Sequence, residues 1–352
     1  MARARKLQIG FIGSGMIANA HMRNFHDDRR TEIRAVADLS KKAREAMAAE
    51  YDIPLVTRDH RKLLSDPDLD AVVVCTPPGS HLALGLDVMR AGKHLIMEKP
   101  LAPTLAAARR LVREAARRPE LMVTGCSCRH ARLQPKFPYI KKMIAAGKLG
   151  EVYFVHHRTV SRQGRPGIEY HPAAKWFLDR NNAGGGPLYD WGVYDLSFHL
   201  GVLGEPEFDS CEAFCINGLD RVAAGTRTFT VEEHGAAMMK FKSGLRYYWE
   251  RASNAHQEIP NQTSIYGTRG GLRFTYVGDA NEITYFYTGD QGKGKVRQRT
   301  YRVNMSRHQG DMHAVGQAVI RALEGKGPVP MPLERELKNL EIMHAVYKAA
   351  GW

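Results

Sequence analysis

Between residue 7 and about residue 124, short apolar runs alternate with longer amphipathic ones. The short runs have the length of buried strands, and the longer runs carry the spacing of helices that cover a sheet. The predicted strands are 7–12, 33–37, 71–75, 94–97 and 121–123, and the predicted helices are 16–25, 41–51, 81–91 and 105–117. This alternation indicates a doubly wound parallel sheet with helices on both faces, so we predict an α/β domain over residues 1–124.

After residue 150 the pattern changes to strands that alternate apolar and polar residues. The predicted strands are 151–162, 236–241, 245–251, 263–266, 272–276, 282–287 and 296–303. Tight-turn residues such as Ser243-Gly244 separate them, and two helices, 311–323 and 334–349, close the chain. We therefore predict a second domain of the α+β class over residues 125–352, with a mostly antiparallel sheet that leaves one face open.

Length and composition are consistent with two globular domains. The chain has 352 residues, of which 43% are hydrophobic and 25% charged, and a chain of this length usually divides into two domains. No uninterrupted apolar stretch is long enough for a bilayer, and no apolar signal region follows the basic N-terminus. We expect a cytoplasmic protein with no membrane partner.

Charge and cysteines add little chemistry of their own. The net charge is +14, but the basic residues form short runs on separate segments without a recognisable nucleic-acid-binding motif. We expect solvated surface and no nucleic-acid partner, although the charge favours anionic ligands. The five cysteines are sparse, and Cys126 and Cys128 lack a matching pair, so we expect reduced thiols and no metal site.

The run Gly10-Phe-Ile-Gly13-Ser-Gly15-Met-Ile-Ala18 lies where the first strand ends and the first helix begins. In that setting Gly13 allows a tight turn and Gly15 lets the backbone approach a pyrophosphate. The helix N-terminus, starting with Met16 and Ile17, offers free N–H donors to phosphates. These residues predict a dinucleotide site; the alternative is a strand–helix turn that needs glycine for its geometry alone.

Asp38 ends the second predicted strand, where a carboxylate reads the adenosine ribose. It accepts from ribose hydroxyls and repels a 2′-phosphate, which favours NAD over NADP. Ser40, Lys41 and Lys42 follow it and could offset that preference, and Asp38 could also cap the next helix.

Thr76, Pro77 and His81 follow the third predicted strand at the same edge of the sheet. We expect Thr76 and Pro77 to line the dinucleotide groove. His81 is either a cofactor contact or an ordinary residue in the first turn of a helix.

Two further segments carry polar side chains suited to proton transfer. Glu98-Lys99-Pro100 follows the fourth predicted strand, and Asp190 and Tyr194 follow the run Gly184-Gly185-Gly186. An ammonium beside a reacting oxygen stabilises a developing alkoxide. Residues four apart on a helix share a face, and the glycines permit close approach of backbone to a ligand.

Taken together, these motifs resemble those of the Gfo/Idh/MocA oxidoreductase family. The resemblance covers nearly the whole chain and implies a Rossmann domain joined to an open-faced β-sheet domain. It also implies NAD or NADP as cofactor and oxidation or reduction of a carbinol carbon on sugars, inositols or related polyols. Lys99 corresponds to the family's lysine between nicotinamide and substrate, with Glu98 beside it in the cofactor site, and Asp190 fits the family pattern.

Tyr194 departs from that pattern, because many members carry histidine, the presumed general base, at this position. The resemblance is then to branches similar to glucose–fructose oxidoreductase and dihydrodiol dehydrogenases. A phenol titrates near ~10, so it acts most readily as an acid toward a carbonyl, or as a base if Lys99 depresses its pKa. The alternative is that Tyr194 only packs and hydrogen-bonds.

The predicted substrate wall comprises Arg129, His171, Lys175 and Trp176. Loop surface, or a structural salt bridge for Arg129, is the alternative. Phe177 and Ser197 stand where many relatives have arginine and aspartate, which leaves the substrate open.

The function expected from these features is hydride transfer between nicotinamide and a carbinol carbon of a sugar, sugar derivative or polyol. Two alternatives remain open at this point: transient sugar oxidation by tightly bound NAD during glycoside cleavage, and a non-catalytic dinucleotide-binding regulator. The open sheet face predicts a homodimer or homotetramer.

Overall fold

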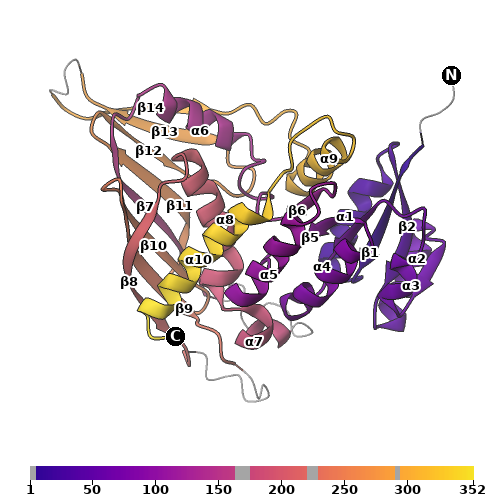
Figure 1. Ribbon diagram of the computed structural model, residues 1–352. Coiled ribbons are helices and arrows are strands. Elements are labelled where there is room, and N and C mark those ends of the chain that lie inside the picture. The colour runs from indigo at the N-terminus through magenta and orange to yellow at the C-terminus, as the bar shows by residue number, and fades with distance from the viewer. Residues whose placement is uncertain (1–4, 163–174, 220–228, 290–293) are drawn as a thin grey trace. The chain divides into compact units, whose positions relative to one another are not determined.

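The computed structural model describes residues 5–162, 175–219, 229–289 and 294–352, which form two compact units (Figure 1). The first unit comprises residues 1–127 and 310–337, and the second comprises residues 128–309 and 338–352. The first change of unit lies three residues beyond the expected boundary at 124. Residues 310–337, expected in the C-terminal domain, belong to the first unit, which is a difference from the sequence-based boundaries.

The first unit is built on six parallel strands in the order β3-β2-β1-β4-β5-β6. The strands are β1 (Leu7–Ile12), β2 (Thr31–Ala37), β3 (Leu55–Thr57), β4 (Ala71–Val74), β5 (His94–Met97) and β6 (Val123–Gly125). The helical segments are α1 (Met16–His26), α2 (Lys41–Tyr51), α3 (His60–Leu64), η1 (Pro78–Ser80), α4 (His81–Arg90), α5 (Leu105–Ala116) and α9 (Asp311–Leu323). The predicted parallel sheet is confirmed.

The strand order reverses between β1 and β4, which are neighbours in the sheet although two strands separate them in sequence. In an open parallel sheet, ligands bind beyond the carboxyl ends of the strands at such a reversal. Both strands are buried, as their apolar sequences require. The loop after β1 holds the glycine turn, and the loop after β4 holds Thr76 and Pro77.

The second unit contains an eight-stranded sheet in the order β14-β13-β12-β11-β7-β10-β9-β8. Only the β7–β10 pair is parallel among its described strand pairs, so the predicted mostly antiparallel sheet is confirmed. Its strands are β7 (Val152–Val160), β8 (Phe208–Ile216), β9 (His234–Phe241), β10 (Arg246–Ala252), β11 (Ile259–Gly267), β12 (Gly270–Phe274), β13 (Glu282–Tyr287) and β14 (Arg297–Arg302). The helical segments are α6 (Lys136–Ala145), η2 (Lys175–Leu178), α7 (Arg180–Ala183), α8 (Pro187–Val202) and α10 (Leu333–Ala349), whose first residues count with the first unit.

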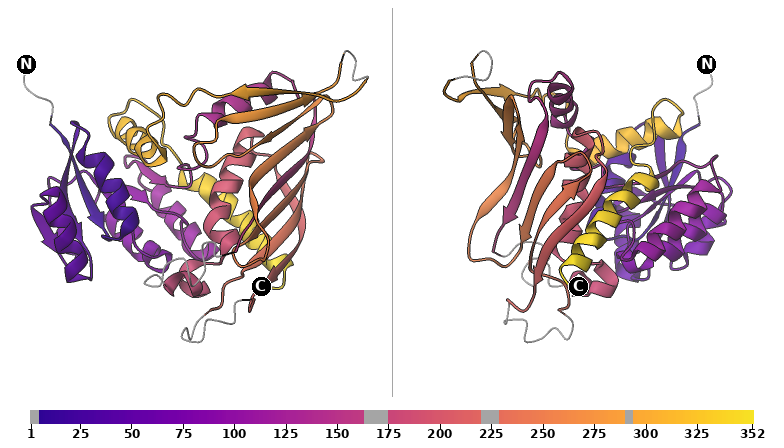
Figure 2. Two further views of the ribbon diagram at one scale, coloured as in Figure 1. Left: turned by 180° about the vertical axis from the view of Figure 1, so that it is seen from behind. Right: turned by 60° about the vertical axis from the view of Figure 1, so that its left-hand side comes forward.

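Helices cover one face of this sheet. On that face the central strands bury Val155, Tyr247, Trp249 and Ile265. Helix α8 packs against β9 and β10, and α6 packs against α8; Figure 2 shows both helices on the same side of the strands. The alternate side chains of the strands, such as Phe154, therefore point to the open face.

Helix α8 is buried on every side. All of its residues except Trp191 are buried, and a helix surrounded by protein needs no polar stripe. This explains why hydrophobic periodicity alone does not predict it. None of the described helices is both long and apolar enough to span a membrane.

Candidate active site

The glycine turn after β1 has the geometry that a dinucleotide requires. Gly13 has φ +97°, and a Cβ there would lie 2.7 Å from the carbonyl oxygen of Cys75, after β4. A Cβ on Gly15 would meet nothing within 4 Å, and α1 has no side-chain cap at its N-terminus. Free N–H groups above open space suit a pyrophosphate, so this turn fits the phosphates of NAD.

Met16 begins α1 and is 67% exposed, while Ile17 beside it is partly buried. Both therefore lie at the open side of the turn, as expected of residues that contact a cofactor.

Asp38 lies directly beside the glycine turn. Its Oδ2 accepts hydrogen bonds from the Ser14 backbone N (2.7 Å) and the Ser14 hydroxyl (2.8 Å). Its Oδ1 accepts from the backbone N of Ser40 (2.7 Å), and Ser40 itself caps α2. Of the nearby cations, Lys41 pairs with Glu45, and Arg44 donates to the carbonyl oxygen of Asp38. The Asp38 carboxylate thus lies directly beside the glycine turn.

The loop after β4 is held by hydroxyl groups and by His81. The Thr76 and Ser80 hydroxyls lie 2.7 Å apart, and Ser80 also donates to the carbonyl oxygen of Pro77. The ring of His81 is fully buried, and its nitrogens lie 2.8 Å from the Thr76 carbonyl oxygen and 3.0 Å from that of Pro100. The ring of His81 therefore lies against the backbone of both loops, and its role as a cofactor contact stays a prediction. Burial lowers its pKa.

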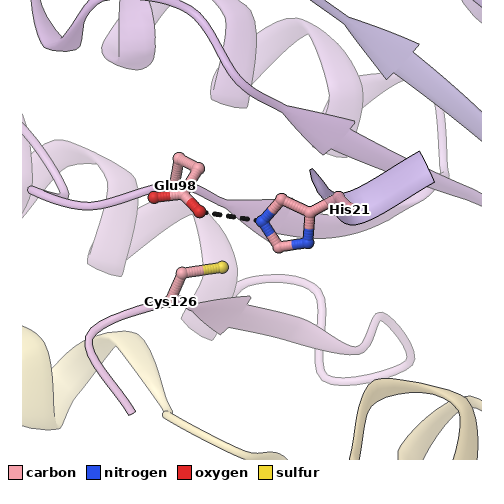
Figure 3. Close-up of side chains that lie close together, drawn as sticks. All are labelled: His21, Glu98 and Cys126. Atoms are coloured by element: carbon pink, nitrogen blue, oxygen red, sulfur yellow. Dashed lines mark hydrogen bonds and ion pairs between the residues drawn. The ribbon is translucent and has the colours of Figure 1, made fainter. Parts of the chain in front are cut away.

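Glu98 holds the backbone at Lys99. Its Oε2 accepts a hydrogen bond from the Lys99 N (2.9 Å), and its Oε1 lies 2.8 Å from Nε2 of His21 on α1. Figure 3 shows the imidazole and carboxylate facing each other. The side chain of Glu98 is only 4% exposed, so this carboxylate positions Lys99 and α1, a role the sequence does not reveal for His21.

Cys126 lies beside the His21–Glu98 pair, and the three ligand-type atoms are all within 4.8 Å of one another. Imidazole, carboxylate and thiolate are groups that bind zinc. Here, however, the imidazole and carboxylate bind each other directly, and the second carboxylate oxygen holds an amide. Both carboxylate oxygens of Glu98 are therefore occupied by hydrogen bonds within the protein.

Helix α8 brings Asp190 and Tyr194 onto one face. Its N-terminus is capped by Glu232, whose oxygens accept from the Gly186 N (2.7 Å) and the Leu188 N (2.9 Å). Burial raises the pKa of Glu232 to about 7. Asp190 lies in the first turn, where the helix dipole stabilises an anion.

The three glycines before α8 serve packing within the second unit. A Cβ at Gly184 would lie 2.4 Å from the ring of Tyr189, and one at Gly185 would lie 2.1 Å from the Tyr347 hydroxyl. A Cβ at Gly186 would lie 1.9 Å from the Glu232 carbonyl oxygen. The expected approach of a ligand to these glycines is thus replaced by contacts with the protein itself.

Tyr194 is paired with Arg129. Nη2 of Arg129 donates a short hydrogen bond to the phenol oxygen, and its Cζ lies 5.5 Å from the ring centroid. The ring of His130 packs edge-on against the same phenol at 4.8 Å. Arg129 is thus bonded to the predicted acid–base residue, and its expected contact with substrate stays a prediction. Sequence reasoning misses this pairing and His130, because 65 residues separate Arg129 from Tyr194.

The other predicted wall residues are placed only in part. Lys175 is exposed at the start of η2, and Trp176 stacks on Phe177 with ring centroids 3.8 Å apart. His171 lies outside the described residues. Ser197 is buried and accepts a hydrogen bond from Arg132 (3.2 Å).

A buried charge fixes the opposite side of α8. The carboxylate of Asp195 accepts from the Arg251 guanidinium at 2.5 and 2.7 Å, from Trp249 at 2.8 Å and from Tyr276 at 2.5 Å. Burial acts to raise the pKa of Asp195, but Arg251 outweighs it and holds that pKa well below its usual value. The helix that carries Asp190 and Tyr194 is therefore anchored to the sheet by a paired charge.

Comparison with known families gives matches over both units. A model of an oxidoreductase family with an NAD-binding Rossmann fold matches residues 7–125. A model of the GFO/IDH/MocA C-terminal domain matches residues 137–273.

Individual relatives are similar over most of their length. Myo-inositol 2-dehydrogenase of Thermotoga maritima is 24% identical over 81% of this chain and 79% of its own. D-glucoside 3-dehydrogenase of Escherichia coli is 24% identical over 98% of this chain and 95% of its own. Among solved structures, a levoglucosan dehydrogenase in complex with NADH and levoglucosan superimposes with a TM-score of 0.83 at 20% identity, covering 99% of this chain and 98% of that one. At this identity the structural likeness establishes the fold.

Proposed function

The chain belongs to the Gfo/Idh/MocA family of NAD-binding oxidoreductases, and from this premise we propose that it transfers hydride between NAD and a carbinol carbon of a sugar, sugar derivative or polyol. The relatives named as inositol and glucoside dehydrogenases support this substrate class. The particular substrate is left to experiment.

One observation carries the proposal: the glycine turn and Lys99 lie at the same edge of the first unit's sheet. Gly13 and Gly15 follow β1, Thr76 and Pro77 follow β4, and Lys99 follows β5, the next strand. Since the carboxyl ends of parallel strands meet at one edge, a dinucleotide bound at the turn extends along this edge toward Lys99.

The chain's own residues then have distinct roles. Bound NAD supplies the nicotinamide ring that accepts or donates hydride. Lys99 stabilises negative charge on the substrate oxygen with its ammonium group. Tyr194 exchanges the proton of that oxygen, and Asp190, one helical turn earlier, orients the polar groups.

Cofactor binding rests on a second set of residues. Gly13, Gly15, Met16 and Ile17 would hold the pyrophosphate, and Asp38 would hold the ribose hydroxyls. Thr76 and Pro77 would line the groove, while Glu98 and His81 support it from within the protein.

The test of the proposal is the variant Lys99→Ala. We expect turnover of a polyol panel that includes myo-inositol and simple glucosides to fall by about 10²-fold or more, since the variant loses charge stabilisation of the reacting oxygen. NAD binding, measured by calorimetry, should stay within a few-fold of the wild type. Lys242→Ala is the matched control, because Lys242 pairs with Glu207 in an exposed turn. Wild-type turnover in the Lys99 variant would refute the assignment.

A further inference from the structure

We propose that Arg129 is a positioning residue that holds Tyr194 in its anionic form, so that Tyr194 acts as the base in carbinol oxidation. This inference rests on the proposed hydride transfer and assigns the direction in which Tyr194 works. It answers the question left by the tyrosine that replaces the family's histidine.

The geometry of the pair is the first argument. The guanidinium donates through Nη2 to the phenol oxygen, and both side chains are buried, with 4% of Arg129 and none of Tyr194 exposed. A hydrogen bond from a cation to a phenol is stronger when the acceptor is anionic. Exclusion of water from the pair raises the strength of that interaction further.

The surrounding charges are the second argument. The carboxylate of Asp195, the next residue on α8, is bound by Arg251. The guanidinium of Arg132 is bound by Glu205. Arg129 donates to the phenol oxygen, His130 contacts the ring by its edge, and Asp190 lies one turn earlier on α8.

The fixed orientation of the ring is the third argument. His130 and Trp191 pack against Tyr194 with ring centroids 4.8 and 5.6 Å away. These contacts hold the phenol plane while Arg129 fixes the oxygen, and an oriented base needs both. Both flanking rings are partly exposed, so the oxygen lies near the border of the buried region.

The proposed oxidation transfers one proton and one hydride from the carbinol group. The carbinol O–H proton passes to the Tyr194 oxygen, and the carbinol carbon gives its hydride to oxidised NAD. A carbonyl group forms, the cofactor is reduced, and the neutral phenol of Tyr194 later returns its proton to solvent. Arg129 stays charged throughout.

The experiment is an ultraviolet difference titration of tyrosine ionisation on the full-length protein. The difference between wild type and Tyr194→Phe isolates the signal of one residue among the 14 tyrosines. The same difference is measured in backgrounds carrying Arg129→Gln, Arg129→Lys and Arg132→Gln. We expect the Tyr194 signal to move to higher pH in Arg129→Gln, to move less in Arg129→Lys, and to stay unchanged in Arg132→Gln.

Kinetics provide the second readout. In Arg129→Gln, polyol oxidation at neutral pH should fall by about 10²-fold, because Tyr194 is then protonated. The rate should recover as pH rises, because higher pH deprotonates Tyr194 without the guanidinium. An unshifted titration signal or an unchanged pH profile would overturn the proposal. If Arg129→Gln does not fold, Arg129→Lys decides by the same two criteria. If no polyol is oxidised by the wild type, the proposed function fails, while the titration still tests the Arg129–Tyr194 link.

Discussion

Asp38 is the residue that we propose binds the adenosine ribose, and its carboxylate lies beside the glycine turn. Both of its oxygens accept from the turn segments that follow β1 and β2, through Ser14 and Ser40. Ser40 is committed to capping α2, and Lys41 to an ion pair with Glu45. The Asp38 carboxylate would repel a 2′-phosphate on the ribose, so we expect a preference for NAD.

We expect Asp38→Asn to raise the ratio of kcat/KM for NADP over NAD by about tenfold or more, a change of about 1.4 kcal/mol. The variant keeps the size of the side chain, replaces one accepting oxygen by an NH2 group and removes the repulsion of a 2′-phosphate. Steady-state kinetics with both cofactors measure the ratio. Glu32→Gln, which neutralises an exposed carboxylate at the opposite end of β2 from Asp38, should leave the ratio unchanged; an equal shift there would point to general surface charge instead.

At the residue scale, sequence predicts positions whose function depends on neighbours along the chain. Gly13, Gly15 and Asp38 follow strands within one local motif, and the structure places them side by side. His21 and Arg129 escape prediction, because their partners Glu98 and Tyr194 lie 77 and 65 residues away. Such pairs are set by tertiary packing rather than by spacing.

At the element scale, helix α8 begins on a buried carboxyl group. Glu232 accepts from two backbone N–H groups of the first turn, and burial raises its pKa to about 7 from an ordinary value of 4.5. In the unfolded chain the same group ionises near its ordinary value. Between these two values the folded protein binds more protons than the unfolded protein.

It follows that stability should fall as pH rises from about 4.5 to about 7, with Glu232 contributing about 3 kcal/mol to that fall. Glu232→Gln cannot ionise, so the free energy of unfolding should depend less on pH in this window. Urea unfolding at a series of pH values measures the slope. Glu336, in the first unit, also has a pKa raised by burial to about 7, and Glu336→Gln is the matched comparison. An undiminished slope in both variants would contradict the assignment.

Elements with a clear period are predicted well, and those without one are missed. The amphipathic helix α5 and the strands β1 and β5 occur where periodicity places them. Periodicity does not predict helix α8, because the helix is buried on all sides and has no solvated polar stripe, nor β3, because it has only three residues. The edge strand β8 was also missed, since its exposed apolar residues obscure the alternation that marks a strand.

At the scale of the whole molecule, the open face of the second unit's sheet offers an area for self-association. A row of rings crosses it, with centroid separations of 5.5 Å for Phe154–Tyr266 and 5.1 Å for His156–Tyr248. Beside the row, Glu250 is bound by Arg158 and His234. A face that carries aromatic groups and both signs of charge can pair with a second copy of itself across a two-fold axis.

We expect Phe154→Glu to lower the oligomeric state measured by light scattering coupled to size-exclusion chromatography. The substitution puts a charge into the centre of the aromatic row, which a second copy would have to desolvate. Lys142→Glu, a charge reversal on α6 at the covered side of the sheet, is the control and should leave the mass unchanged. A wild-type mass equal to one chain would contradict the expectation.

The division into units shows the limit of prediction from local patterns. The change from the sequence pattern of a parallel sheet to that of an antiparallel sheet predicts the domain boundary near residue 124. Met331, however, bonds to Gly125 (2.9 Å), and Gln317 bonds to Arg30 and Asp28, so a late segment of the chain packs with the first unit. A contact between segments some 200 residues apart produces no periodic pattern of apolar residues in the sequence, so it cannot be predicted in this way.

The three glycines before α8 differ in what would have to change if any of them were replaced. At Gly185 the nearest obstacle is the hydroxyl end of Tyr347, and the Cβ of Tyr189 lies 2.8 Å away, so a smaller residue at position 347 would remove only part of the clash. At Gly186 the obstacle is a backbone oxygen, which no side-chain change elsewhere can remove. Gly185 is therefore held by neighbouring side chains, whereas Gly186 is held by the main chain itself.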